Sequence, residues 1–195
     1  MNAINKRVLV QGIVQGVGFR PTVYGYAQKL GLTGWQNIPG TLMEVQSIGM
    51  MFKDSDIITG SRASEETVKK LSKDRELSGY KIIHFASHGL VVPEIPDLCA
   101  LVLTQSETEK KDDGYLTMKE IMELDIKADF INLSACETGL GKIYGGEGVV
   151  GLTQSFLIAG ANGLSVSLWQ VADKSTMEFM TGFYSLIAAD KKTGY

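Results

Sequence analysis

The sequence predicts an α/β protein in which a mainly parallel sheet is covered by helices. Short apolar runs alternate along the chain with segments that carry helix-start signals, and this alternation is typical of parallel sheets with crossover helices. The length of 195 residues suits one ordinary domain, or one domain with a small appendage. Hydrophobic residues make up 44% of the chain and charged residues 21%, which is the balance of a folded globular protein.

Six apolar runs are predicted as strands, and four positions are predicted to start helices. In chain order the strands are Arg7 to Ile13, Asp56 to Ile58, Tyr80 to Ala86, Cys99 to Thr104, Phe130 to Ser134 and Leu164 to Leu168. The helix starts are Thr41, Ser64, Thr117 and Ser175. At Thr41, Thr117 and Ser175 a Glu follows three residues later, which is the capping-box pattern that satisfies the free amides of a first helical turn. Two acidic residues follow Ser64 and favour the positive end of a helix dipole.

Composition and charge exclude several classes of function. The chain has 19 Lys and Arg against 22 Asp and Glu, a formal net charge of −3, so it offers no overall basic field for a phosphate backbone and no nucleic-acid partner is expected. The most apolar stretch, Val149 to Trp169, is interrupted by polar residues, so no membrane span is expected. Two cysteines, Cys99 and Cys136, are too few for a disulfide scaffold and indicate a reducing, cytoplasmic location.

Both histidines of the chain fall in one segment, YKIIHFASHG. The strand is expected to end at Ala86, which places His88 and then Gly89 at its carboxyl end, where open parallel sheets carry their working groups. His84 lies in the middle of the strand and is expected to be a core histidine. A second apolar strand, FINLS, runs into Cys136, so this cysteine is expected at the carboxyl end of another strand.

A base and a thiol at two strand ends favour nucleophilic chemistry. A thiol with a pKa of about 8.5 is mostly protonated at neutral pH, and a nearby imidazole can take its proton. The alternative is that Cys136 is a small buried hydrophobe, as we expect for Cys99 within LCALVLT. Metal binding is not expected, because His84 and His88 lie too far apart on a strand to share one ion easily. No cofactor is expected either. A phosphate loop at Gly139 to Lys142 is rejected, since its first Gly and its Ser or Thr are missing.

Six strings from Ile38 onward resemble the CHAT domain, a caspase-like cysteine-peptidase family often found beside helical TPR repeats. The strings are IPGTLMEVQSI, HFASHG, DDGYLTMKEI, NLSACETGLG, GGEGVVGLTQSFLIAGANGLSVSLWQVAD and STMEFMTGFY. The resemblance implies a caspase-like three-layer fold and a cysteine-type endopeptidase with His88 as general base and Cys136 as nucleophile. It implies an oxyanion hole of the Gly89 and Cys136 backbone amides, a protein or peptide substrate and a TPR-containing regulatory partner. Glu137 and Asp173 are expected as acidic contacts for a basic substrate side chain.

The segment from Val8 to Asn37 resembles acylphosphatase, especially the acylphosphatase-like domain of the carbamoyltransferase of hydrogenase maturation. The hallmark VQGVGFR is complete at Val14 to Arg20. Amides of the loop are expected to cradle a phosphate; its residues are Gln15, Gly16, Val17, Gly18 and Phe19. The resemblance implies that Arg20 binds the phosphoryl group and that Asn37, one residue out of register, matches the water-positioning Asn. Because only one strand and one helix of that domain are recognisable, Arg7 to Ile13 and Pro21 to Leu30 are predicted to pack against the main sheet.

The two resemblances divide the chain near Pro39-Gly40. Residues 1–37 are predicted to be a partial acylphosphatase-like segment, and residues 38–195 a CHAT domain. The family continues beyond GFYSLIAADKKTGY through another helix and a final apolar strand, so a truncated C-terminal sheet edge is expected. The charged run Glu107 to Gly114 is predicted to be a solvated connecting loop. Three functions remain open at this point: a cysteine endopeptidase, a non-catalytic interaction module and an acylphosphatase.

Overall fold

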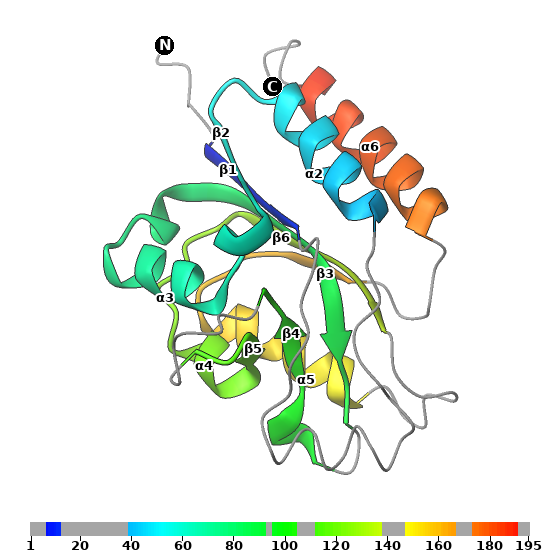
Figure 1. Ribbon diagram of the computed structural model, residues 1–195. Coiled ribbons are helices and arrows are strands. Elements are labelled where there is room, and N and C mark those ends of the chain that lie inside the picture. Colours follow the sequence, from blue (N-terminus) through cyan, green and yellow to red (C-terminus); the bar gives the residue numbers. More distant parts are fainter. Residues whose placement is uncertain are drawn as a thin grey trace.

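A seven-stranded sheet forms the centre of the molecule (Figure 1). It is seen in a computed structural model that describes residues 7–12, 39–92, 95–104, 112–137, 147–166 and 173–190. The strands are β1 (Arg7–Gly12), β2 (Ser55–Thr59), β3 (Tyr80–Leu90), β4 (Ala100–Val102), β5 (Tyr115–Thr117), β6 (Phe130–Glu137) and β7 (Leu164–Val166). The helices of four residues or more are α2 (Pro39–Met51), α3 (Glu65–Lys73), α4 (Met118–Met122), α5 (Glu147–Ile158) and α6 (Asp173–Asp190).

The long strand β3 organises the sheet. On one side it pairs with β1, and β1 in turn pairs with β2. On the other side it pairs with β6, which carries β7. These four pairings are parallel. Strand β4 is antiparallel to β3 and pairs with it at His88 to Leu90, beyond the end of β1, and β5 is antiparallel to β4. The sheet is therefore mainly parallel, as predicted.

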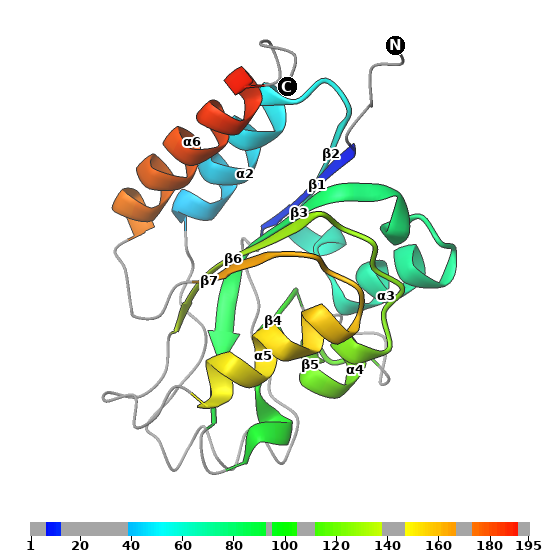
Figure 2. The same ribbon diagram turned by 180° about the vertical axis from the view of Figure 1, so that it is seen from behind.

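Helices cover the sheet on both faces and make three layers (Figures 1 and 2). Helices α2 and α6 lie side by side on one face, where an apolar cluster that includes Val45, Ile48 and Tyr184 packs on Ile82 and Ala86 of β3. The other face carries α3, α4 and α5 and the larger core cluster of the described residues. Successive side chains of a strand point to opposite faces, so β3 supplies alternate residues to the two cores.

Two strands extend further than their apolar patterns predicted. Strand β3 continues from Ala86 to Leu90, and β6 continues from Ser134 to Glu137. The extra residues of β3 are held between β6 and the antiparallel β4, so pairing on both sides prolongs a strand whose local sequence has become polar and glycine-containing. The sequence also missed β5, which has only three residues and thus no measurable period.

Two of the four predicted helix starts are confirmed. Ser64 caps α3 by accepting a hydrogen bond from the Thr67 amide, and Thr117 and Glu120 form a complete capping box at α4. The predictions at Thr41 and Ser175 were wrong. Helix α2 begins at Pro39, where the fixed φ of proline suits a first helical position, and α6 begins at Asp173, whose charge favours a helix start.

The N-terminal strand is an inner strand of the main sheet. Strand β1 pairs along its length with β2 on one side and β3 on the other, which confirms the expected packing of Arg7 to Ile13 for the residues up to Gly12. The predicted helical piece, Pro21 to Leu30, lies outside the described residues.

The end of the charged run is anchored, in contrast to the solvated loop that the sequence predicted. Gly114 is buried and its amide donates to Glu65 Oε2 at 2.9 Å, while Asp112 Oδ1 lies 2.8 Å from Lys69 Nζ. Gly114 has a φ of 83°, which glycine adopts without strain, so the chain turns sharply into β5. The rest of the run, residues 107–111, lies outside the described residues.

Candidate active site

The candidate site is built on two neighbouring parallel strands, β3 and β6. Their register places His84 beside Asn132, Ala86 beside Ser134 and His88 beside Cys136. Register partners on adjacent parallel strands lie on the same face of a sheet, and so do residues two apart on one strand. These three rungs therefore form one column on the face that α2 and α6 cover, with the His88–Cys136 rung nearest the carboxyl ends of the strands.

His88 is buried inside the sheet. The side chain is 3% exposed, and the residue pairs with Cys136 on β6 and with Val102 on β4. Its carbonyl oxygen accepts a hydrogen bond from Ser87 Oγ at 3.3 Å. The sequence placed His88 and Gly89 just after a strand, and this was wrong, because β3 runs on to Leu90. The register nevertheless brings the predicted base and the predicted nucleophile to one rung.

The structure describes some of the other predicted site residues and not the rest. Gly89 is in register with Leu101 of β4 and with Glu137, the last residue of β6. Asp173 is the first residue of α6. For Cys136, Glu137 and Asp173 the structure describes the backbone only. The acylphosphatase-like residues lie outside the described part of the chain; they are Gln15, Gly16, Val17, Gly18, Phe19, Arg20 and Asn37.

His84 is a core histidine, as predicted, and it is the centre of a buried polar cluster. The side chain is fully buried, and its Nδ1 lies 3.1 Å from the Tyr184 hydroxyl of α6 and 3.0 Å from Asn132 Nδ2 of β6. Its Nε2 lies 2.9 Å from Glu44 Oε1 of α2, within ion-pair distance but without the alignment of a hydrogen bond. Four elements thus meet at one imidazole, which ties both covering helices to the two central strands.

The contacts of His84 indicate one tautomer of its neutral ring. An amide nitrogen can only donate, so with Asn132 Nδ2 facing it, His84 Nδ1 accepts and the ring hydrogen of the neutral form sits on Nε2, toward Glu44. Burial, and then the nearby Glu44 carboxylate, raises the pKa of Tyr184 well above its ordinary value. The Tyr184 hydroxyl therefore keeps its proton at all physiological pH values.

The sequence did not indicate Asn132 and Ser134 as members of this column, or Glu44 and Tyr184 as its partners on the covering helices. Glu44 had been assigned to a capping box, but its side chain is 1% exposed and turned toward His84. A usable signal was present in FINLS, where Asn132 and Ser134 are polar residues inside an otherwise apolar strand. Buried polar side chains need partners, so such positions indicate a polar cluster nearby.

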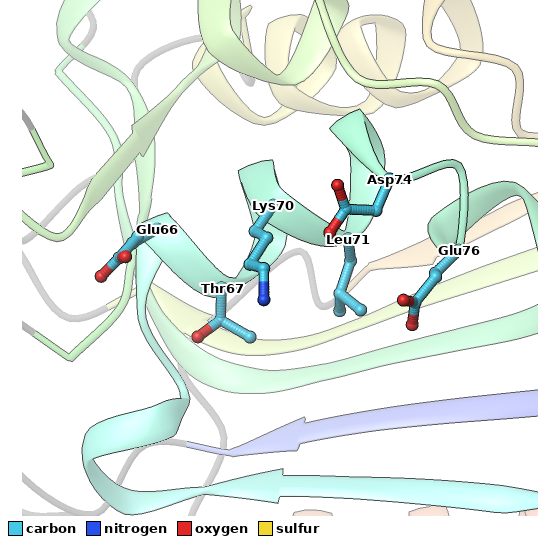
Figure 3. A pocket seen from close by; sticks show the side chains of 6 residues that line it. All are labelled: Glu66, Thr67, Lys70, Leu71, Asp74 and Glu76. Atoms are coloured by element: carbon cyan, nitrogen blue, oxygen red, sulfur yellow. The ribbon is translucent and has the colours of Figure 1, made fainter.

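A separate hollow of about 260 Å³ lies along α3 and its following turn. Figure 3 shows the six residues that line it: Glu66, Thr67, Lys70, Leu71, Asp74 and Glu76. Its helix belongs to the layer opposite α2 and α6, so it is distinct from the His88 column (Figure 1). Within the described residues, no group of three or more His, Cys, Asp or Glu could hold a metal ion.

A comparison with protein-family models identifies the family of this chain. The model of the CHAT domain family matches residues 5–194, which is almost the whole chain. The chain belongs to the CHAT domain family. CHAT domains form a caspase-like, peptidase-related family, so the resemblance inferred from HFASHG and NLSACETGLG is confirmed. The matched range begins at residue 5, and β1 is therefore part of what resembles the CHAT domain.

Curated relatives match parts of the CHAT chain. Carbamoyltransferase HypF2 of Cupriavidus necator is 49% identical over 43 residues, 22% of this chain and 5% of that protein. The acylphosphatase of Bordetella avium is 32% identical over 84 residues, 42% of this chain and 89% of that protein. Tetratricopeptide repeat protein 28 of Mus musculus is 29% identical over 101 residues, 50% of this chain and 4% of that protein. The chain thus spans about a twentieth of the carbamoyltransferase.

These matches confirm the second resemblance, to acylphosphatase-like sequences. The acylphosphatase match covers more residues than the 30 between Val8 and Asn37 on which the sequence argument rested. Among solved structures, a Streptococcus pneumoniae TIGR4 flavodoxin aligns with 94% of this chain and 99% of its own at 9% identity, with a TM-score of 0.46. In the described part of the chain, each helix is too short or too polar to cross a membrane.

Proposed function

We propose that this CHAT domain is a cysteine-type endopeptidase that cleaves a protein or peptide substrate through Cys136 and His88. The observation that carries the proposal is the register of β3 and β6, which makes these two residues partners on one rung. A nucleophile and its base must lie within reach of one another, and neighbouring rung positions meet that condition. Membership of the caspase-like CHAT family adds independent support.

The proposed reaction is acyl transfer. The His88 imidazole takes the Cys136 thiol proton, and the thiolate attacks the scissile carbonyl carbon to give a tetrahedral intermediate. Backbone amides of Gly89 and Cys136 are the proposed donors to its oxyanion, whose charge is largest in the transition state. Collapse expels the amine, which takes the proton from the imidazolium, and water then hydrolyses the thioester.

Burial favours this division of roles. Because His88 is 3% exposed, bulk water screens its charge poorly, and an imidazolium there interacts strongly with a neighbouring thiolate. We further propose that Glu137 and Asp173 contact a basic side chain of the substrate. Glu137 is the last residue of β6, in register with Gly89, and Asp173 is the first residue of α6.

The test compares wild type with Cys136→Ala, and with Cys99→Ala as matched control. Cys99 is buried in the larger core cluster, where its Sγ accepts a hydrogen bond from the Val92 amide. Cys99→Ala therefore removes a thiol outside the His88–Cys136 rung. Cleavage of a pooled peptide library and labelling by iodoacetamide are measured together. We expect both to disappear in Cys136→Ala only; a wild-type protein that is folded yet neither labelled nor active contradicts the proposal.

Acylphosphatase activity is a second candidate, because an acylphosphatase matches the chain over 89% of its own length. In this proposal Arg20 holds the phosphoryl group, the amides of Gln15 to Phe19 cradle it, and Asn37 orients water. Hydrolysis of benzoyl phosphate is the assay. Acylphosphatase activity is supported if Arg20→Ala loses this hydrolysis and Cys136→Ala retains it. It is excluded if Arg20→Ala and wild type hydrolyse benzoyl phosphate at equal rates.

The third candidate is a non-catalytic interaction module with a TPR-containing partner. It is favoured by the match to a tetratricopeptide repeat protein over half of this chain. Binding to TPR domains with unchanged affinity in Cys136→Ala, together with an inert wild-type thiol, supports this function over the peptidase. A cytoplasmic location remains part of the proposal.

A further inference from the structure

Buried polar atoms without hydrogen-bond partners gather directly beneath the His88–Cys136 rung. Five such side-chain atoms occur among the described residues, and four of them belong to the same column and its covering helix. They are Glu44 Oε1, His84 Nε2, Asn132 Oδ1 and Ser134 Oγ. Glu44 Oε1 and His84 Nε2 lie 2.9 Å apart, within ion-pair range of each other. Asn132 Oδ1 and Ser134 Oγ accept or donate no hydrogen bond among the described residues.

Ser134 occupies the position between the two polar rungs. It is 4% exposed and lies beside Ala86, one rung below His88 and Cys136 and one rung above His84 and Asn132. Rungs on one face repeat at about 6.6 Å, and adjacent strands lie about 4.8 Å apart, so diagonal Cα positions are about 8 Å apart. A direct side-chain contact over that span is long for serine, whereas one bridging water fits it. Ala86 has the smallest side chain of the three β3 residues in this column.

Buried water is the usual partner of such groups. Internal waters typically make about three hydrogen bonds to polar groups that have no other partner. Ser134 Oγ and Asn132 Oδ1 supply two, and the imidazole of His88 lies on the next rung of the same face. A general base works best when a third group orients its ring.

We propose that Ser134 and Asn132 hold a buried water beneath His88, and that this water connects His88 to the Glu44–His84 pair. Ser134 and Asn132 are then positioning residues: they act on the thiol of Cys136 through the orientation of His88. This inference rests on the proposed function, because it concerns the same base and nucleophile.

The test is the pH profile of Cys136 alkylation by iodoacetamide in the full chain, with the labelled cysteine identified by peptide mass spectrometry. Ser134→Ala is expected to raise the midpoint by about one pH unit, which lowers the alkylation rate by about tenfold at pH values well below both midpoints. The matched control is Ser155→Ala. Ser155 is equally buried, but its Oγ donates to Gly151 O within α5 on the opposite layer, so its profile is expected to match wild type.

A second pair of variants separates orientation from folding. Ser134→Thr and Ser134→Val have nearly the same shape and differ in the hydroxyl group. We expect Ser134→Thr to restore the wild-type midpoint and Ser134→Val to behave like Ser134→Ala. Equal profiles for Ser134→Thr and Ser134→Val, or a Ser134→Ala profile within about twofold of wild type, overturn the inference.

The same experiment distinguishes the two proposals. A wild-type midpoint near the ordinary thiol value of about 8.5 shows that Cys136 is not activated, and the proposed function fails. A lowered wild-type midpoint that none of the Ser134 variants changes leaves the peptidase proposal standing and removes only the water-mediated link.

Discussion

His84 and His88 are four residues apart on β3, lie on the same face and have different surroundings. His84 is enclosed by Glu44, Asn132 and Tyr184, whereas His88 shares its rung with Cys136. The difference arises from depth along the strand. His84 lies where α2 and α6 cover the sheet, and His88 lies near the carboxyl ends of the parallel strands, where ligands bind in open α/β sheets.

At this scale the Glu44–His84 pair provides a stability test. Glu44→Leu leaves the buried Nε2–H of His84 facing an apolar side chain, so we expect the free energy of unfolding to fall by about 2 kcal/mol. Glu44→Gln keeps a polar acceptor beside His84 and is expected to lose clearly less. Urea unfolding of both variants measures the difference. If the Leu variant is as stable as the Gln variant, the pair makes no net contribution.

Among the elements, α3, α4 and the turn before β5 are held together by a single ammonium group. Lys69 Nζ lies 2.5 Å from Glu65, 2.8 Å from Asp112 and 3.1 Å from Glu120. Burial raises the pKa of Glu65 to about 6, with Glu120 adding to the effect and Lys69 opposing it. Burial alone lowers the pKa of Lys69, but its hydrogen bonds to Asp112, Glu65 and Glu120 outweigh burial and raise it.

The sign of the pH dependence follows from the Glu65 pKa. In the folded state the pKa of Glu65 is about 6, above its ordinary value of 4.5, so the folded state binds more protons than the unfolded state between these two pH values. The contribution of Glu65 to the free energy of unfolding is therefore present below pH 4.5 and is lost as the pH rises from about 4.5 to about 6. Lys69→Met removes the compensating cation, so we expect a larger loss of unfolding free energy at pH 8 than at pH 5. Lys70→Met, on the exposed side of α3, is the control and is expected to show no such pH dependence.

The turn after α5 depends on a glycine. Gly160 has a φ of 110°, and a Cβ there lies 1.9 Å from the Ile126 carbonyl oxygen. We expect Gly160→Ala to lower the unfolding free energy by at least about 2 kcal/mol, because alanine is strained at this φ and the contact is with backbone. The control is Gly182→Ala in α6, where an added Cβ meets no atom outside its own helix backbone within 4 Å. We expect this variant to raise the free energy of unfolding by up to about 1 kcal/mol. Thermal unfolding measures the melting temperatures of both variants. If the two variants melt at similar temperatures, the turn does not depend on glycine at position 160.

In the whole molecule, the described N-terminal strand β1 belongs to the main sheet. Strand β1 separates β2 from β3 and pairs with both, so its removal leaves two strands with unpaired backbone groups inside the sheet. The predicted boundary at residue 37 was derived from family strings, which carry no information about strand order.

Deletion tests this coupling. Residues 38–195 expressed alone are expected to lack cooperative unfolding, since β2 loses its β1 partner. Removal of residues 1–5 is the control, because it leaves β1 intact, and it is expected to preserve the transition. Circular dichroism with temperature measures both. A cooperative transition in the 38–195 chain, near that of the full chain, shows an independent domain.

The sequence by itself determined the α/β class, the position of most strands, two helix caps and the family, because apolar periodicity and cap chemistry are local and the motifs are contiguous. It also placed His88 and Cys136 as candidates. Only the tertiary structure decided that these residues share a rung, that Glu44 faces His84 and that β3 extends to Leu90. Those features depend on strand register and helix packing between segments that are distant in the sequence. Local sequence patterns do not show which distant segment a residue contacts.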